Sequence, residues 1–461
     1  MRIPADHYLL HAYLDKFGLN DQLFPFEMEN KVIYLSGMPA GQRTMTYAQF
    51  NNRLVTQDPV LLGLFPGLRN EEKGKTCDDL FDEAVQAVKN RWQAVYAHHG
   101  GALQPPYTSN ALAEAYRVII EEYDNYTLRT YLTDVAGWSN SALDLYDLGN
   151  AHVVFENSFI ESFKDAFLSS NNAGSEAGMQ QLQSGMDAVP KAFLNDEDVG
   201  IDKDIIFGAR VKRIRPEGAG VRAYYDNPSG GEFSAMADYL VLAIPYTAQR
   251  TMSKDIAFTP RKEMAVRTVR YVEVTKVLLQ YRSRWWRDSF TQLGQGTDGG
   301  VVCDLPIRYT MFPKEEGNQQ FVNNARGAIM AAYTFEQDAT ILGSLAKHRR
   351  IALAARNIAT IFPGANSLDL LEAGISQVFP IDEFAGGSAF CYFGPMQKSR
   401  FLEAMCETDW EDKVFFAGEQ ASSSHGWIEG AIEAGLRCVF QIIDAAAGEE
   451  WAIIHVAREK I

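Results

Sequence analysis

Polar and aromatic residues follow a short apolar segment in the C-terminal part of the chain. Val414–Gly418 has the composition of a buried strand, and Glu419, His425, Gly426 and Trp427 come soon after it. Apolar residues then recur at steps of three and four, which predicts a helix from Trp427 onward. Ligands of α/β sheets lie beyond the carboxyl ends of strands, where helix amides favour negative charge or carbonyl oxygens. We therefore expect a ligand site here, with Glu419 accepting hydrogen bonds from the hydroxyls of a sugar-like group.

The same segment carries a resemblance to a known family. Ala417–Glu419, then five residues, then the letters HGWIEGAIEAG resemble the C-terminal flavin segment of the flavin amine oxidase superfamily, and the HGW form is most similar to L-amino acid oxidases. The resemblance implies FAD as the cofactor. It implies that Glu419 binds the ribityl chain and that the helix starting near Ile428 points at the isoalloxazine ring. It also implies that Trp427 and the carbonyl of Gly426 flank the α-amino group of a substrate.

The first residues of the chain carry a second part of the resemblance. MRIP, followed by a helix that ends in FGL, is similar to the L-amino acid oxidase segment with the carboxylate-binding arginine, which Arg2 matches. Tyr333, at the end of the predicted strand Gly327–Tyr333, matches the tyrosine that shares this carboxylate. A guanidinium binds a carboxylate through two parallel hydrogen bonds, so it fixes orientation as well as charge. Without the resemblance, Arg2 would be interpreted as a solvated surface residue, and Tyr333 equally well as a tyrosine with its hydroxyl in water.

Four further positions follow from the resemblance. Lys276, in a predicted strand, matches the lysine that holds a water against flavin N5; the alternative is a lysine that extends to the surface. Ser388 stands where monoamine oxidases have a cysteine bonded to the flavin, so FAD is expected to be non-covalent. Ala389 replaces a tyrosine of their aromatic cage and leaves room for an amino-acid side chain. Val211 matches a valine that binds the adenine, although any strand valine would look alike.

These matches predict the oxidative deamination of an L-amino acid to a 2-oxo acid, ammonia and hydrogen peroxide, with the amino acid and O2 as small-molecule partners. Lys164 or Asp165 could meet the substrate side chain, against the simpler interpretation of a solvated helix end. Three other functions stay open. The first is an amine or polyamine oxidase, which would not need Arg2. The second is a flavin monooxygenase that converts its amino acid to an amide, and the third is a truncated, non-catalytic paralogue.

The composition argues against several classes of partner. The chain of 461 residues carries a formal net charge of −16, which disfavours nucleic acid and an anionic membrane surface. No apolar run has the length of a transmembrane helix, and the first thirty residues lack a signal peptide, so we expect a cytoplasmic protein. The five cysteines are scattered, which predicts free buried thiols rather than disulfides or a metal site.

The order of predicted elements indicates an α/β protein with an FAD-binding sheet, a mixed-sheet (α+β) substrate domain and a helical insertion. The expected domains are 1–48 for the first segment of the substrate domain, 49–172 for the helical domain, 173–258 with 409–447 for the FAD-binding domain, and 259–408 for the rest of the substrate domain. In the FAD-binding part, Ile205–Ile214 and Val221–Tyr225 are predicted strands, and Tyr239–Ile244 is predicted to be a fully buried strand.

A dinucleotide-binding fold begins with a strand, G-x-G-x-x-G and a helix, and the 461 residues contain no such succession. The Rossmann-like domain is therefore expected to be incomplete, with unpaired sheet edges and no helix N-terminus for the pyrophosphate. Three explanations are open. Either the start codon was misplaced, or a second chain (a further copy or a different partner) supplies the segment, or the chain is a degenerate paralogue. We favour the first two explanations over the third.

Overall fold

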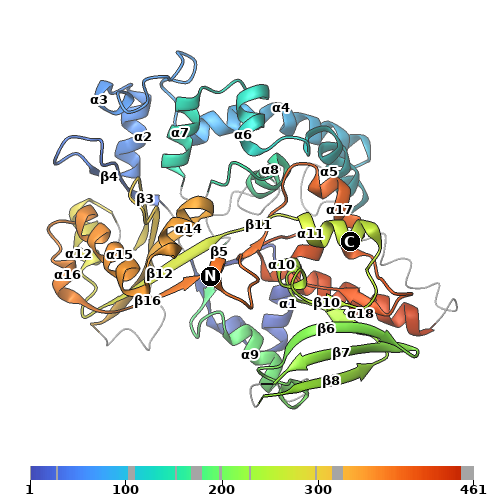
Figure 1. Cartoon of the computed structure of the whole chain (residues 1–461). Coiled ribbons are helices and arrows are strands. Elements are labelled where there is room, and N and C mark those ends of the chain that lie inside the picture. The colour runs from blue at the N-terminus through green and yellow to red at the C-terminus, as the bar shows by residue number, and fades with distance from the viewer. Residues whose placement is uncertain are drawn as a thin grey trace.

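The structure, a computed structural model, describes residues 2–26, 30–101, 109–150, 153–167, 179–196, 200–227, 230–295, 298–313 and 325–447. Helices occupy one end of the molecule, a seven-stranded sheet lies to one side below them, and a four-stranded sheet projects at the opposite corner (Figure 1). This combination of helices with parallel and mixed sheets confirms the predicted fold class.

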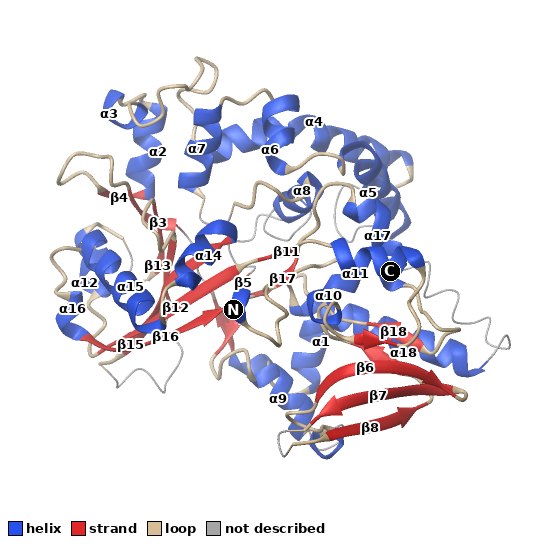
Figure 2. Ribbon diagram, in the orientation of Figure 1, coloured by secondary structure: helices blue, strands red, loops and turns tan. Residues whose placement is uncertain are grey.

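The seven-stranded sheet combines the N-terminal part of the chain with segments from its second half (Figure 2). Its strands run antiparallel to their neighbours except for the parallel pair β13–β3. In order they are β16 (Leu371–Val378), β12 (Val274–Tyr281), β15 (Gly327–Phe335), β14 (Tyr309–Phe312), β13 (Gly299–Cys303), β3 (Asn30–Tyr34) and β4 (Thr44–Thr46). Every second side chain of β12 points into a core that it shares with α15 (Lys347–Ile361), namely those of Val277, Leu279 and Tyr281. This is expected because successive side chains of a strand point to opposite faces.

The helical part lies between β4 and β5 in the sequence. It contains α2 (Tyr47–Val55), α3 (Pro59–Leu62), α4 (Cys77–His98), α5 (Ser109–Tyr123), α6 (Leu128–Thr130), α7 (Asn140–Gly149) and α8 (Phe159–Phe167). The start of α4 shows why these segments are helical. The Thr76 hydroxyl accepts the Asp79 amide at 3.1 Å, and the Asp79 carboxylate accepts the Thr76 amide at 2.9 Å. This capping box satisfies two amides that the helix itself leaves without partners.

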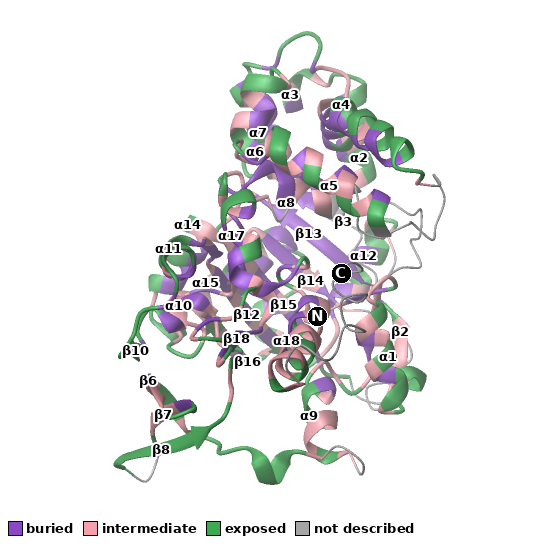
Figure 3. Ribbon diagram, turned by 90° about the vertical axis from the view of Figure 1, so that its right-hand side faces the viewer, coloured by how far each residue is buried: buried purple, intermediate pink, exposed green. Residues whose placement is uncertain are grey.

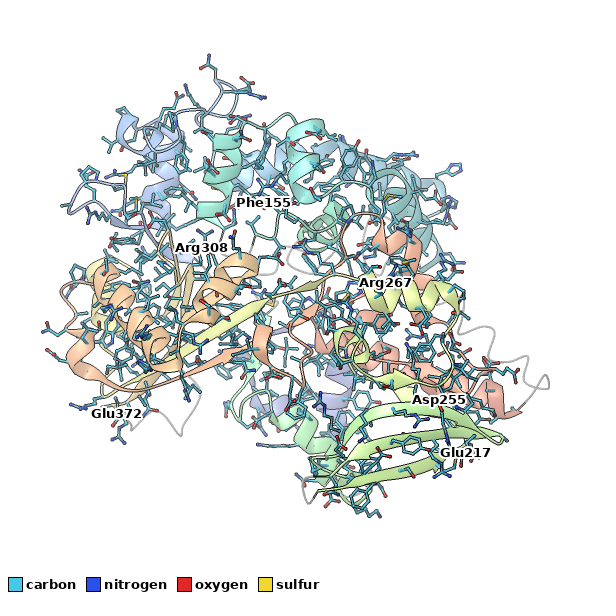
Figure 4. All side chains as sticks on the ribbon, in the orientation of Figure 1. Phe155, Glu217, Asp255, Arg267, Arg308 and Glu372 are labelled. Atoms are coloured by element: carbon cyan, nitrogen blue, oxygen red, sulfur yellow. The ribbon has the colours of Figure 1, made fainter. Side chains whose placement is uncertain are left out.

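The four-stranded sheet has the order β10 (Ser253–Lys254), β6 (Arg210–Glu217), β7 (Gly220–Asp226) and β8 (Glu232–Ala237). Every residue of β8 is exposed (Figure 3). Residues of this sheet form ion pairs, including Arg213 with Asp255 and Arg222 with Glu217. Asp255 and Glu217 are labelled in Figure 4. The prediction of a strand over Ile205–Ile214 is wrong at its start, because Gly208 adopts a φ of +72° and the strand begins only at Arg210.

A short parallel pair, β9 (Leu240–Leu242) with β18 (Val414–Phe416), precedes the predicted helix, which is α18 (Ile428–Ala447). The strand, loop and helix predicted over 414–439 are therefore confirmed. The prediction that Tyr239–Ile244 is fully buried is wrong. Leu242 points into a core with Val414, whereas Val241, on the opposite face of β9, is 39% exposed.

The N-terminal segment lies beside α18. Here β1 (Ile3–Pro4) and β2 (Leu23–Pro25) pair antiparallel with β5 (Met179–Leu182), and α1 (Tyr8–Lys16) connects them. Ile3 and Leu10 form a small core against which Ile428 packs. The predicted helix end at Gly18 is confirmed by its φ of +63°, a conformation that glycine adopts without steric strain.

The remaining helices are α9 (Ala188–Asn195), α10 (Tyr246–Gln249), α11 (Pro260–Thr268), α12 (Trp286–Gln292), α14 (Glu336–Ser344), α16 (Ser367–Leu370) and α17 (Gln397–Cys406), and a further strand pair joins β11 (Tyr271–Val272) to β17 (Phe390–Cys391). Within the ranges given above, no helix is both long and apolar enough to cross a membrane. All five cysteines are free thiols and four of them are buried, as predicted.

Candidate active site

Arg2 and His7, from the N-terminal segment, both contact Trp427. The guanidinium carbon of Arg2 lies 5.4 Å from the centroid of the indole ring, within the range of a cation–π interaction. The His7 ring meets the same indole edge-on, with centroids 5.0 Å apart. Burial lowers the pKa of His7 to about 4, so at neutral pH its imidazole is uncharged. Of these two neighbours of Trp427, only Arg2 is a cation.

Tyr333 and Lys276 lie opposite each other on β15 and β12. The Lys276 ammonium is 4.7 Å from the centroid of the Tyr333 ring, and burial lowers the pKa of this lysine. Burial raises the pKa of Tyr333, and the nearby charge of Arg2 acts against this rise. The same charge acts on Tyr309 of β14, whose pKa is raised by burial to about 12. Arg2 therefore lies close enough to influence both phenols.

An apolar wall adjoins these polar groups. Ala389, just before β17, donates its amide to the carbonyl of Val272 at 2.8 Å. The side chains packed together here are those of Val154, Val272, Val274, Tyr333, Phe335, Phe379, Ala389, Phe390 and Tyr392. Gly426 approaches this wall closely, since its φ is +74° and a Cβ atom at this position would lie 3.2 Å from the Phe390 ring. Only a glycine combines this backbone conformation with so close a contact.

Glu419 connects the two segments on either side of this wall. Its carboxylate accepts the amide of Cys391 at 2.8 Å and the amide of Gly426 at 2.9 Å. Burial raises the pKa of Glu419, whereas His425 and the two amides act in the opposite direction. Both oxygens thus have a backbone donor, and each retains a lone pair for one further donor, because a carboxylate offers about four acceptor positions.

Ser388 lies on a polar cavity of about 710 Å³. The serine is buried, and its hydroxyl has no hydrogen-bond partner among the described residues. Arg270 and Glu336, which form an ion pair, line the same cavity together with Arg250 and Gln397. A buried hydroxyl without a partner is rare in folded proteins, so this position is suited to a group that the polypeptide does not supply.

The structure places a buried ionic cluster behind the loop that carries Gly426 and Trp427. Glu161 of α8 accepts a hydrogen bond from Lys398 of α17 at 2.7 Å, and its other oxygen lies 3.2 Å from Nδ1 of His425. Burial disfavours the ionised carboxyl, but Lys398 and His425 together hold the pKa of Glu161 well below its usual range. This cluster was not apparent from the sequence, because its members are separated by long stretches of chain.

Two predicted residues lie apart from the contacts described so far. Val211 is on β6 in the four-stranded sheet, paired with Tyr225 and 37% exposed, and no described contact links it to Arg2 or Trp427. Ile428 is the first residue of α18 and packs on the core of Ile3 and Leu10. The charge of Lys164 acts on His7, whereas the side chain of Asp165 lies outside the described residues.

His7 and Tyr309 are the members of this group that sequence reasoning missed. His7 comes shortly after the MRIP segment and is the N-cap residue of α1, so its place between Arg2 and this helix was the one available signal. Tyr309 has no such neighbour. Its strand, β14, pairs with β13 through Val302 and with β15 through Met311, and these long-range pairings place Tyr309 in one cluster with Tyr333.

The sequence of this chain is similar to those of L-amino-acid oxidases from other organisms. An L-amino-acid oxidase from Siganus canaliculatus is 26% identical over 445 residues, covering 96% of this chain and 75% of that protein. One from Vipera ammodytes ammodytes is 28% identical over 443 residues, covering 95% of this chain and 80% of that protein.

Solved structures share the fold. Putrescine oxidase bound to putrescine matches with a TM-score of 0.65 at 16% identity, covering 96% of this chain and 86% of that one. Cyclohexylamine oxidase from Brevibacterium oxydans IH-35A matches with a TM-score of 0.63 at 17% identity, covering 97% and 87%. The model of the family described as flavin containing amine oxidoreductase matches residues 1–443, and the chain therefore belongs to the flavin-containing amine oxidoreductases.

Proposed function

We propose that this oxidoreductase oxidises the Cα–N bond of an L-amino acid to an imine, which water hydrolyses to a 2-oxo acid and ammonia, while O2 takes up the two electrons and two protons and leaves as hydrogen peroxide. The observation that carries the proposal is the cation of Arg2 against Trp427, with its charge acting on Tyr333. A fixed cation beside a buried phenol suits a carboxylate, which accepts hydrogen bonds from both. An amine without a carboxylate has no use for this cation and would be repelled by it when protonated.

The residues present fit the ring end of a flavin. The partnerless hydroxyl of Ser388 and the remaining lone pairs of Glu419 are suited to the polar groups of a cofactor. Serine has no thiol to bond a flavin, and burial raises the pKa of the nearby Cys391 thiol far above its usual range. We therefore propose FAD held without a covalent bond. When bound, this cofactor supplies the redox chemistry by accepting a hydride from the substrate Cα and passing the electrons to O2.

Each side chain then has a separate part in orienting the substrate. Arg2 and Tyr333 would hold the carboxylate, while Trp427 and the carbonyl of Gly426 would flank the amino group. Ala389 would leave space for the substrate side chain on the apolar wall. Lys276, whose pKa is lowered by burial, would hold a water molecule close to the reacting centre. This division of roles depends on orientation and electrostatics rather than on a general base.

The test compares an L-amino acid with the amine that lacks only its carboxylate, for example L-leucine with isopentylamine, by peroxide release. Arg2→Gln should lower kcat/KM for the amino acid about 100-fold, the effect of removing about 3 kcal/mol from a buried charge-assisted pair. Turnover of the amine should not fall, because the amine makes no pair with Arg2 and the repulsion of its ammonium group is removed. Arg2→Lys, which keeps the charge and loses the paired geometry, should lie between the parent and Arg2→Gln.

Other results identify the alternatives. A parent protein that prefers the amine is an amine oxidase, the activity named for the putrescine and cyclohexylamine oxidases that share its fold. An amide product with little peroxide indicates a monooxygenase. A folded, colourless protein that cannot be reconstituted with FAD indicates a non-catalytic paralogue.

A further inference from the structure

Helix α1 is capped by a residue from the opposite end of the chain. Its N-cap residue, His7, makes no side-chain capping hydrogen bond. Instead, the amides of Leu9 and Leu10 donate to the two carboxylate oxygens of Glu429, at 2.9 and 2.8 Å. The first amides of a helix lack intrahelical partners and favour negative charge, so this carboxylate satisfies two of them and complements the helix dipole.

The position of Glu429 connects this cap to the candidate active site. Glu429 lies two residues after Trp427, in the first turn of α18. The segment that leads into α1 carries Arg2 and His7, and both contact Trp427. The carboxylate that holds the start of α1 therefore belongs to the same turn as the indole that this segment contacts. Helices α1 and α18 lie against each other over this stretch (Figure 1).

We propose that Glu429 is a positioning residue that fixes the Arg2 segment against Trp427 and thereby sets the geometry of carboxylate binding. This inference rests on the proposed function, because it assigns the site that Arg2 forms to a substrate carboxylate. Glu429 contacts the amides of α1 and acts on the substrate only through Arg2 and Trp427.

Loss of Glu429 should leave the fold intact. Ile3, Leu10 and Leu14 are buried in the small core on which Ile428 and Ile432 pack, so α1 and α18 stay together through apolar contacts when the carboxylate is removed. The expected change is a looser start of α1 and a wider distribution of Arg2 positions. Such a change weakens binding of the carboxylate but leaves the chemical step of the bound substrate unaltered.

The experiment uses Glu429→Ala and Glu429→Gln in the flavin-loaded protein, with Glu433→Ala as the matched control. Glu433 lies one turn further along α18 and accepts hydrogen bonds from Ser423 rather than from α1. Glu429→Ala should raise KM for the amino acid about tenfold, the equivalent of about 1.4 kcal/mol, and change kcat by less than about twofold. Glu429→Gln retains one acceptor oxygen and should restore part of the loss. Glu433→Ala should keep the parent KM.

A second readout does not depend on turnover. Hydrogen exchange measured by mass spectrometry on peptides covering residues 2–10 should show faster exchange of the Leu9 and Leu10 amides in Glu429→Ala than in the parent or in Glu433→Ala. Unchanged exchange at these amides, an unchanged KM, or a fall in kcat equal to the change in kcat/KM would each overturn the proposal. Failure of the proposed function has a different signature: Arg2→Gln in the parent background would then affect amino acids and amines alike.

Discussion

At the scale of single residues, Trp427 has two dissimilar neighbours. Arg2 presents a charge to the indole, whereas His7, with a pKa lowered by burial to about 4, presents a neutral ring edge. A second cation at the position of His7 would compete with Arg2 for the carboxylate of the proposed substrate. Because His7 is uncharged, Arg2 is the cation among these two neighbours of Trp427.

Gly426 allows a test at this scale. Gly426→Ala should destabilise the protein by about 1–2 kcal/mol, because alanine is strained at a φ of +74°. The added Cβ, 3.2 Å from the Phe390 ring, should also shift the loop that carries Trp427 and raise KM for the substrate. Urea unfolding and steady-state kinetics measure the two effects.

The matched control for this substitution is Gly435→Ala. Gly435 lies in the interior of α18, and a Cβ there meets no atom within 4 Å. This change should stabilise the protein by about 0.5–1 kcal/mol, because alanine has the higher helix propensity. Equal stability of the two variants would show that the backbone at Gly426 is not constrained.

At the scale of elements, local periodicity predicted the units that carry the site. The apolar spacing over α18 and the MRIP segment with its helix identified the neighbourhoods of Trp427 and Arg2, and both helices are present. Periodicity failed where burial depends on neighbours that the local sequence does not specify. The apolar letters of β9 predicted burial on both faces, but Val241 is exposed.

The contacts that assemble the site could not be predicted, because their partners are far apart in the chain. His425 and Glu161 are separated by 264 residues, and Leu9 and Glu429 by 420. Each of these residues, viewed locally, has the pattern of an ordinary helix or loop position. The resemblance to a family supplied Arg2, Tyr333 and Lys276, whereas the carboxylates that hold the surrounding elements emerged only from the structure.

The ionic cluster between α8, α17 and the loop before α18 leads to a prediction at this scale. The side chains of Lys398 and Glu161 are 2% and 3% exposed, so removing Glu161 leaves Lys398 buried without its counter-ion, and removing Lys398 leaves Glu161 with His425 as its remaining partner. Glu161→Gln and Lys398→Met should each destabilise the protein by about 3–5 kcal/mol. The double variant should be more stable than the sum of the two losses predicts, by at least about 1 kcal/mol.

Urea unfolding of the parent, the two single variants and the double variant gives the coupling free energy. Additive losses would mean that the two charges are solvated in the folded protein and do not act as a pair. A double variant that retains parent stability would show that the pair contributes no net stability to the fold, since buried pairs are often replaced by apolar groups at no net loss.

At the scale of the whole molecule, the candidate site is assembled from distant parts of the chain. The seven-stranded sheet provides Lys276 and Tyr333, the N-terminal segment provides Arg2, and the loop before α18 provides Trp427. Such a site exists only when these parts are packed against one another, so the free energy of unfolding is directly relevant to function.

A buried lysine links that stability to pH. Lys262 of α11 is fully buried, and its ammonium donates to the carbonyls of Met405 and Glu407 at 3.2 and 2.7 Å. The same group lies 3.6 Å from the centroid of the Phe416 ring on β18. Burial lowers the pKa of Lys262 from 10.5 to about 7. Between these two values the unfolded chain binds one more proton than the folded protein, so stability rises with pH in this window.

Replacement of Lys262 should remove this dependence. Relative to Lys262→Met, the free energy of unfolding of the parent should rise by about 1.4 kcal/mol per pH unit above pH 7, levelling off near pH 10.5, and should be independent of pH below pH 7. Lys262→Gln should show the same pH dependence as Lys262→Met, because neither side chain titrates. The two variants differ only in that glutamine can still donate a hydrogen bond. Urea unfolding between pH 6 and pH 10 measures the difference in the free energy of unfolding between the parent and each variant. The other titrating groups do not contribute to this difference, because they are common to both proteins. A difference that stays constant over this range would mean that Lys262 remains charged in the folded protein and that its carbonyl partners and Phe416 compensate for its burial.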